Sequence, residues 1–238
     1  MALFFGKKKE KPFVSAVIPA AGSSTRMGGG NKLMLEIDDI PVLARTIMAF
    51  ENCGEIDEII LVCREQDMVE YQDLIVNFDF EKVSRIVRGG KTRTESVLAG
   101  VRAAGQAAYV AIHDGARPLV SDEIITDAVR AAIRDRAAAP VVPIKDSVKK
   151  MEGGKIVADV PRSGIVAVQT PQCFERELIL EALERAIQEN LPLTDDCSAV
   201  ELLGVPCTAT EGSYQNLKIT TPEDLEIAET LLHMEEEI

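Results

Sequence analysis

The sequence predicts an α/β fold in which helices cover both faces of a mostly parallel sheet. Strand-like and helix-like segments alternate along almost the whole chain, which is the pattern of such a fold. The first strand-like segment, 14–18, empties into a loop of small residues, as ligand-binding strands of α/β sheets do. The 238 residues, 46% of them apolar, suffice for one large core. We therefore expect a single domain over 14–238, after a flexible extension over 1–13.

The individual elements follow from composition and periodicity. Apolar and β-branched runs predict strands at 14–18, 56–63, 83–87, 109–113, 140–144, 165–168, 207–210 and 216–219. Apolar residues at helical spacing predict helices over 41–50, from 92, from 121, over 178–187 and from 221. Thr92 and Glu95 have the spacing of a capping box, and Ser121 and Thr221 are expected N-caps.

One stretch, 147–160, interrupts the alternation of strands and helices. Its residues alternate around Glu152-Gly153-Gly154-Lys155, which is a hairpin turn signal. We expect a hairpin arm over about 145–162. An isolated pair of strands is only marginally stable, so a projecting arm needs a partner surface, most simply a second subunit. The alternative is a hairpin folded onto the edge of its own sheet.

Composition excludes several classes of partner. The net charge of −13 disfavours nucleic acid, whose phosphates the surface would repel. No run approaches the roughly 20 apolar residues of a membrane span. The five cysteines are odd in number and scattered, which indicates reduced thiols in the cytoplasm.

The loop after the first predicted strand is the strongest functional signal. Small residues (Pro19, Ala20, Ala21 and Gly22) let a ligand approach the backbone N–H groups, which cradle anions. Arg26 and Lys32 add two positive charges to the same loop. The combination suits a nucleoside triphosphate, although the loop is neither a P-loop nor a G-x-G-x-x-G fingerprint. The alternative is a surface turn with solvated cations.

Two further loops follow predicted strands. Asp114 comes directly after the strand 109–113, where a carboxylate can hold a hydrated Mg²⁺ beside phosphates, and Arg117 can meet a phosphate bidentately. The alternative for Asp114 is a cap for backbone N–H groups. Gly90 permits close backbone approach, and Ser96 can donate to a base or a phosphate.

Late in the chain, Thr194 precedes paired aspartates, Asp195 and Asp196. They are interpreted first as N-cap and first-turn carboxylates opposing a helix dipole, with a metal or acid–base pair as the alternative. Lys218 is a solitary lysine inside an apolar run, which favours a functional contact.

Taken together, these motifs resemble a known family. The matching motifs, in chain order, are Pro19-Ala20-Ala21-Gly22, Arg26-Met27, Lys32, Gly89-Gly90, Arg93, Ser96-Val97, His113-Asp114-Gly115-Ala116-Arg117-Pro118, Thr170-Pro171-Gln172, Thr194-Asp195-Asp196, Lys218 and Pro222-Glu223-Asp224-Leu225. The chain resembles the 2-C-methyl-D-erythritol 4-phosphate cytidylyltransferases of the non-mevalonate isoprenoid pathway. The resemblance covers nearly everything from Val14 to the carboxyl terminus.

The resemblance implies a Rossmann-like nucleotidyltransferase fold and a homodimer joined through the hairpin arm. It implies transfer of a cytidylyl group from CTP to a sugar-alcohol phosphate with Mg²⁺ assistance, at a site where Asp114 contacts the metal. On this basis Arg26 and Lys32 are catalytic. Substrate-binding roles fall to Ser147, Arg162, Thr170, Thr194, Lys218 and Arg117, and nucleotide-binding roles to Pro19, Ala20, Ala21, Gly22, Gly90, Ser96 and Asp114. The alternatives are a cytidylyltransferase for ribitol 5-phosphate and a non-catalytic nucleotide-binding module.

Overall fold

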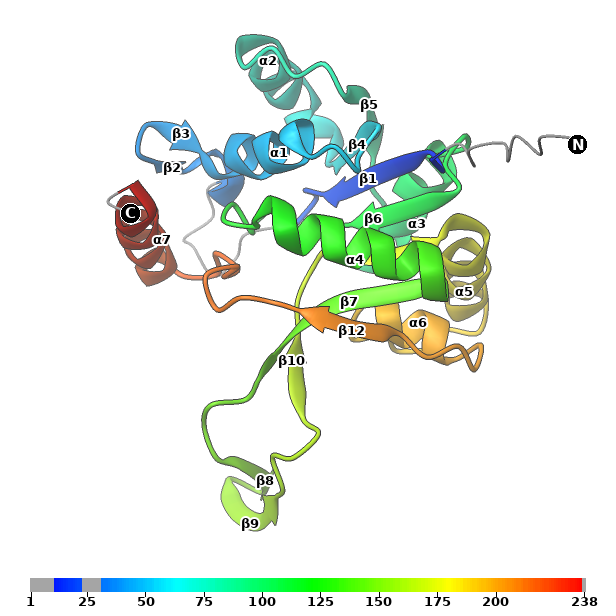
Figure 1. Cartoon of the computed structure of the whole chain (residues 1–238), viewed down its shortest axis with the longest axis vertical. Helices are drawn as coiled ribbons and strands as arrows, with labels where there is room; N and C mark the ends of the chain where they lie inside the picture. The colour runs from blue at the N-terminus through cyan, green and yellow to red at the C-terminus, as the bar shows by residue number, and fades with distance from the viewer. Residues whose placement is uncertain (1–10, 23–30, 237–238) are drawn as a thin grey trace, which may run out of the picture.

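The computed structural model describes residues 11–22 and 31–236 (Figure 1). Its strands are β1 (Val14–Pro19), β2 (Glu36–Ile37), β3 (Ile40–Pro41), β4 (Glu58–Cys63), β5 (Val83–Arg88), β6 (Tyr109–Ile112), β7 (Ala137–Pro143), β8 (Val148–Glu152), β9 (Lys155–Val160), β10 (Val166–Val168), β11 (Gln172–Glu175) and β12 (Thr208–Glu211). Its α-helices are α1 (Val42–Asn52), α2 (Met68–Asn77), α3 (Arg93–Ala103), α4 (Asp122–Asp135), α5 (Arg176–Gln188), α6 (Asp196–Glu201) and α7 (Pro222–Glu236). Short 3₁₀ turns lie at Lys32–Met34 and Glu65–Asp67.

A mixed, mostly parallel sheet forms the centre of the molecule, as the sequence predicts. The strand order is β10-β7-β11-β6-β1-β4-β5, with β12 paired to β7. The pairs β1–β4, β1–β6, β4–β5 and β7–β12 are parallel, whereas β10 and β11 run antiparallel to their neighbours. Because β1 lies between β4 and β6, the loops that follow these parallel strands meet at one edge of the sheet.

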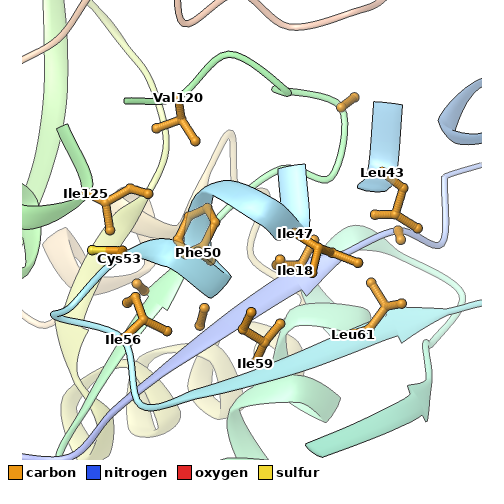
Figure 2. Close-up of a cluster of buried hydrophobic side chains, with 14 of the residues drawn as sticks. Ile18, Leu43, Ile47, Phe50, Cys53, Ile56, Ile59, Leu61, Val120 and Ile125 are labelled. Carbon is orange, nitrogen blue, oxygen red and sulfur yellow. The ribbon is translucent and has the colours of Figure 1, made fainter. Parts of the chain in front are cut away.

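Helices cover both faces of the sheet. Alternate residues of β1 point to opposite faces, so Ile18 joins the core beneath α1, α2 and α4 while Val17 joins the core beneath α3, α5 and α6. In the first of these cores, shown in Figure 2, α1 packs Leu43, Ile47 and Phe50 against side chains of β1 and β4. The α/β prediction with two covered faces is therefore confirmed.

The hairpin of β8 and β9 projects from the body of the molecule, as Figure 1 shows. The two strands pair with each other in a separate two-stranded sheet, so the hairpin is an arm and the interpretation as a sheet-edge flap is wrong. Its large apolar side chains lie open to solvent: Met151, Ile156 and Val157 are 69%, 72% and 50% exposed.

The structure differs from the expected elements in several places, among them the short strands β2 and β3, which the sequence did not predict. The segment 216–219 is not a strand, because its backbone and side chains bond to neighbouring loops: the Ile219 N–H donates to Ala116 O, and Arg117 donates to Asn216 O. The antiparallel strand β11, with four residues, and the helix α2 are absent from the prediction, although Tyr71, Leu74 and Ile75 of α2 lie at helical spacing.

The amino-terminal end of the described chain is anchored to the sheet. The carbonyl of Phe13 accepts from the Ala108 N–H, and the Lys11 ammonium donates to Gly54 O. Residues 1–10 of the predicted flexible extension lie outside the described residues. Within residues 11–22 and 31–236, no helix is long and apolar enough to cross a bilayer.

Candidate functional site

A cavity of about 340 Å³ opens where β1, β5 and β6 end. Its walls are Pro19, Ala20, Ala21, Gly22, Lys32, Leu33, Gly90, Lys91, Thr92, Arg93, Ser96, Asp114, Gly115, Ala116, Lys218 and Thr220. The cavity thus brings together every predicted nucleotide-binding residue with Lys32 and Lys218. Arg26, the other residue predicted to be catalytic, falls within 23–30, outside the described residues.

The glycine loop before α3 requires residues without a side chain. A Cβ on Gly90 would collide with the Cβ of Glu95, and one on Gly89 would lie 2.7 Å from the Ser96 hydroxyl. That hydroxyl accepts from the Gly90 N–H (3.1 Å) and donates to Thr92 O (2.9 Å). The predicted capping box of Thr92 and Glu95 is confirmed. Ser96 therefore shapes the cavity wall by holding the loop against the first turn of α3.

Asp114 is the one carboxylate among the described residues that line the cavity, and three cations surround it. Its oxygens lie 2.8 Å from Lys218 Nζ, 3.5 Å from an Arg93 nitrogen and 3.8 Å from Arg117 Nε. Burial alone would raise the pKa of Asp114, but the charges of Lys218 and Arg93 outweigh it and lower the pKa to about 2. Asp114 is therefore ionised and neutralises a cluster of positive charge.

Arg93, the first residue of α3, connects the cavity wall to the first turn of α6. Its guanidinium forms two hydrogen bonds with the Asp196 carboxylate, of 2.9 and 2.8 Å, while also contacting Asp114. Burial raises the pKa of Asp196, which is 1% exposed, and the Arg93 charge opposes that shift. Asp195 is the N-cap of α6 and Asp196 lies in its first turn, so the capping interpretation is confirmed. Site prediction from the sequence missed the role of Arg93, although the residue stands inside the matching motif.

His113 supports Asp114 from behind through a chain of hydrogen bonds. Its Nε2 lies 3.1 Å from Arg117 O, and its Nδ1 lies 3.0 Å from the Thr170 hydroxyl, which accepts from the Asp114 N–H (3.2 Å). A carbonyl oxygen only accepts, so Nε2 carries the proton. Burial lowers the pKa of His113 to about 4, so the ring is neutral near pH 7 and Nδ1 accepts the Thr170 proton.

We expect His113 to make the protein acid-sensitive. The unfolded chain takes up a proton near pH 6.5, whereas the folded protein does so near pH 4, so folding stability rises with pH between these values. The free energy of unfolding should fall by about 3 kcal/mol between pH 7 and pH 4 from this residue. Urea titrations of the wild type, His113→Gln and His233→Gln across that range measure the effect. His233 is exposed, so its variant should keep the pH dependence that His113→Gln loses; an equal slope in all three proteins would contradict the assignment.

Two of the three lysines that line the cavity, Lys32 and Lys218, are held in place through the irregular segment 213–220. Lys32 Nζ donates to Ile219 O (2.8 Å), and the neighbouring Lys218 pairs with Asp114. Buried Asn216 fixes this segment because its amide donates to Thr170 O (2.9 Å). The cations are therefore held by backbone and buried side chains.

None of the remaining predicted substrate residues lines the cavity. Arg117 lies behind Asp114 and donates to Asn216 O (2.6 Å), and Thr170 is 4% exposed in the same wall. Thr194 precedes the cap of α6, where its N–H donates to Ser198. Ser147 and Arg162 lie at the base of the arm, where Arg162 donates to the Lys145 carbonyl.

An α/β sheet with small-residue loops and anchored cations at the ends of its parallel strands has the architecture of a nucleotide-binding enzyme. Comparison with known proteins identifies the family to which this enzyme belongs. The sequence model of the 2-C-methyl-D-erythritol 4-phosphate cytidylyltransferase family matches residues 14–234. The chain belongs to this family of nucleotidyltransferases.

Individual relatives agree with the family assignment. Proteins named 2-C-methyl-D-erythritol 4-phosphate cytidylyltransferase from Clostridium perfringens and Bacillus cereus are 44% and 43% identical over 220 residues, covering 91% and 92% of this chain and 97% of each relative. The crystal structure of 4-diphosphocytidyl-2C-methyl-D-erythritol synthase from Anaerococcus prevotii is 32% identical with a TM-score of 0.83, covering 94% of this chain and 97% of that one. The structure of the Thermus thermophilus cytidylyltransferase is 32% identical with a TM-score of 0.77, covering 91% and 98%.

Proposed function

We propose that the protein transfers the cytidylyl group of CTP to 2-C-methyl-D-erythritol 4-phosphate, releasing pyrophosphate, in the synthesis of isoprenoid precursors. Besides the family membership, one observation supports this above all. Lys32, Lys218 and Asp114 converge on the cavity that the small-residue loops line. A non-catalytic nucleotide-binding module would be expected to have lost Arg26, Lys32 or Asp114, and the sequence carries all three.

The proposed reaction is an in-line displacement at the α-phosphorus of CTP. A phosphate oxygen of the acceptor forms the new P–O bond, and the bond to pyrophosphate breaks. That oxygen is ionised near pH 7, so no general base is required. Catalysis then consists of positioning and charge stabilisation. Lys32, together with Arg26, would stabilise the negative charge that develops around the α-phosphorus.

The nucleotide would occupy the cavity described above. We propose that its cytosine lies against Ala20, Ala21 and Gly22 and against the loop that Gly90 and Ser96 form. Neither Gly89 nor Gly90 has room for a side chain, so this loop packs directly against Ser96 and Glu95 of α3. Pro19 and Asp114 complete the wall on the side of β1 and β6.

Mg²⁺ is the proposed cofactor, and the donor set fits it only if the nucleotide supplies most ligands. Among the described residues, no group of three His, Cys, Asp or Glu side chains could hold a metal ion. Asp114 offers one carboxylate, already close to three cations. A triphosphate supplies the remaining hard oxygen ligands that Mg²⁺ prefers. When bound, the ion would neutralise charge on the phosphates and the leaving pyrophosphate.

The acceptor phosphate would bind on the side of Lys218. We propose that Lys218 and Arg162 hold this phosphate, helped by Ser147 and Thr194. Arg117 and Thr170 would act indirectly, through Asp114. Arg117 contacts the Asp114 carboxylate, and the Thr170 hydroxyl accepts a hydrogen bond from the Asp114 N–H. Their effect on the acceptor then depends on the position of Asp114.

We propose a homodimer in which each arm completes the partner's acceptor site. The exposed Met151, Ile156 and Val157 give the arm an apolar surface, which a second copy would cover. Arg162, at the base of the arm, would then reach the acceptor site of the other subunit.

Mixed subunits test this exchange. We expect Lys32→Ala and Arg162→Ala to be nearly inactive alone. In a twofold dimer, random mixing gives one intact site in half of the dimers, so a refolded equimolar mixture should recover about a quarter of wild-type activity. Pyrophosphate release by the mixture measures this. If Arg162 served its own subunit, every site in the mixture would lack one residue and no activity would return.

The activity itself is tested by pyrophosphate release from CTP and Mg²⁺ with 2-C-methyl-D-erythritol 4-phosphate or ribitol 5-phosphate as acceptor. Release with the methylerythritol substrate alone is the expected result. Release with ribitol 5-phosphate alone would show that the protein uses a different acceptor. No release from protein that still binds CTP would favour a non-catalytic nucleotide-binding module.

A cytoplasmic location completes the proposal. All five cysteines are free thiols, which persist in a reducing compartment.

A further inference from the structure

The cavity lysine Lys32 begins a short 3₁₀ turn, Lys32–Met34, whose N-cap is Asn31. The Lys32 ammonium is anchored by Ile219 O at 2.8 Å. The backbone end of the same side chain is set by where Asn31 holds the turn. The position of a flexible four-carbon side chain depends on both ends, so Asn31 bears directly on where the charge lies.

Asn31 is fixed by three hydrogen bonds. Its Oδ1 accepts from the Leu33 N–H (3.4 Å) and from the Tyr71 hydroxyl (3.2 Å), and its Nδ2 donates to Glu70 (2.9 Å). Tyr71 and Glu70 belong to α2, and none of the described residues that line the cavity comes from that helix. The side chain of Asn31 therefore connects the turn to an element outside the site.

Tyr71 is a rigid attachment point. Tyr71 is fully buried, and its ring packs in the core with Leu74 of the same helix. Burial raises the pKa of the Tyr71 hydroxyl well above its usual range, so the group stays protonated and donates to Asn31. A buried tyrosine hydroxyl needs such a partner, and the fixed ring gives that partner one favoured position.

We propose that Asn31 and Tyr71 are positioning residues that hold Lys32 in register with the α-phosphate of the bound nucleotide. This inference rests on the proposed function of Lys32 and adds a link from the core helix α2 to the reacting centre. Small displacements of a group that stabilises charge are costly, because such groups act through fixed geometry.

Tyr71→Phe tests the link with the loss of a single oxygen atom, while the ring stays in the core. We expect kcat to fall about tenfold while KM for both substrates and the melting temperature change little. Tyr109→Phe is the matched control, since its hydroxyl donates to Ile133 O (3.4 Å) and Tyr109 begins β6, away from the cavity end of that strand. Its kcat should equal that of the wild type. An unchanged kcat in Tyr71→Phe would overturn the proposal.

Repeating the Tyr71→Phe change in the Lys32→Ala variant separates an effect on the position of Lys32 from a general structural effect. In Lys32→Ala, the added Tyr71→Phe change should cause no further loss, because the anchor acts through the missing ammonium. A further tenfold loss there would overturn the proposal. The paired change Asn31→Asp with Glu70→Gln exchanges donor and acceptor between the two side chains and keeps the acceptor for Tyr71. It should restore most of the activity that Asn31→Ala loses, and failure to do so would count against the anchor.

A readout without turnover keeps this test separate from the proposed reaction. Labelling of Lys32 by acetic anhydride, followed by peptide mass analysis with and without CTP, reports how firmly the amine is held. We expect labelling in Tyr71→Phe to rise about threefold over the wild type and over Tyr109→Phe, in line with the loss of one hydrogen bond. Equal labelling in the three proteins would overturn the proposal even if the wild type used a different acceptor.

Discussion

Replacing Lys32 by alanine is expected to lower kcat about 1000-fold, as removal of one preorganised donor to developing charge does in other enzymes. The Ile219 carbonyl holds the ammonium at the cavity, so its charge is in place before the reaction and costs no reorganisation. KM for CTP should change only a few-fold, because the rest of the nucleotide is proposed to bind to the glycine loop and Ser96. Steady-state pyrophosphate release at saturating substrates measures both constants.

Lys82→Ala is the matched control for this prediction. Lys82 Nζ also donates to a backbone carbonyl, Cys53 O, at 2.8 Å, but Lys82 does not line the cavity. Its loss should leave kcat unchanged. A Lys32→Ala protein that keeps more than a tenth of wild-type kcat would show that Lys32 contributes little to stabilising the transition state.

The fold could be predicted largely because local signals agree with the tertiary structure. Thr92 and Glu95 form the capping box that the sequence predicts, and Ser121 accepts from the Ile124 N–H to begin α4. The first strand alternates between two apolar cores, so its position needed no knowledge of its neighbours. Such elements carry their own start signals and buried faces.

Elements that depend on distant partners escaped prediction. The segment 216–219 has the composition of a strand, yet Arg117, Ala116 and Lys32 satisfy its backbone groups from elsewhere in the chain. β11 is short and inserts antiparallel between β6 and β7, which only the assembled sheet specifies. Tertiary contacts determine the conformation of these segments, and the periodicity of the local sequence does not reveal those contacts.

At the site, the sequence predicted the loops that line the cavity but not the hydrogen bonds that hold these loops in place. The residues predicted to bind the nucleotide converge on one cavity because they follow neighbouring parallel strands. The hydrogen-bonded pair of Arg93 with Asp196 joins residues 103 positions apart, and His113 reaches Thr170 across 57. No spacing rule connects residues so distant, so these supports appear only in the folded protein.

Replacing Asp114 by asparagine is expected to destabilise the folded protein strongly. The change keeps the shape of the side chain but leaves Arg93, Arg117 and Lys218 without their shared negative partner. Breaking a buried ion pair from one side costs about 3–5 kcal/mol, so the free energy of unfolding at pH 7 should fall by that amount. Activity should fall at least about 100-fold, because Lys218 would lose its contact with the carboxylate. Urea unfolding and pyrophosphate release measure the two effects.

The pH dependence distinguishes Asp114 from His113. The folded pKa of Asp114, about 2, lies below the unfolded value, so its stabilisation is present above pH 4 and is lost as the pH falls towards 2. This loss amounts to about 2–3 kcal/mol. His113 acts between pH 6.5 and 4, where the unfolded chain binds the extra proton. Asp114→Asn should therefore flatten the stability curve only below pH 4, and His113→Gln only above it. If Asp114→Asn left the wild-type slope below pH 4 intact, the three cations would not be stabilising an ionised carboxylate, and the electrostatic account of the site would be wrong.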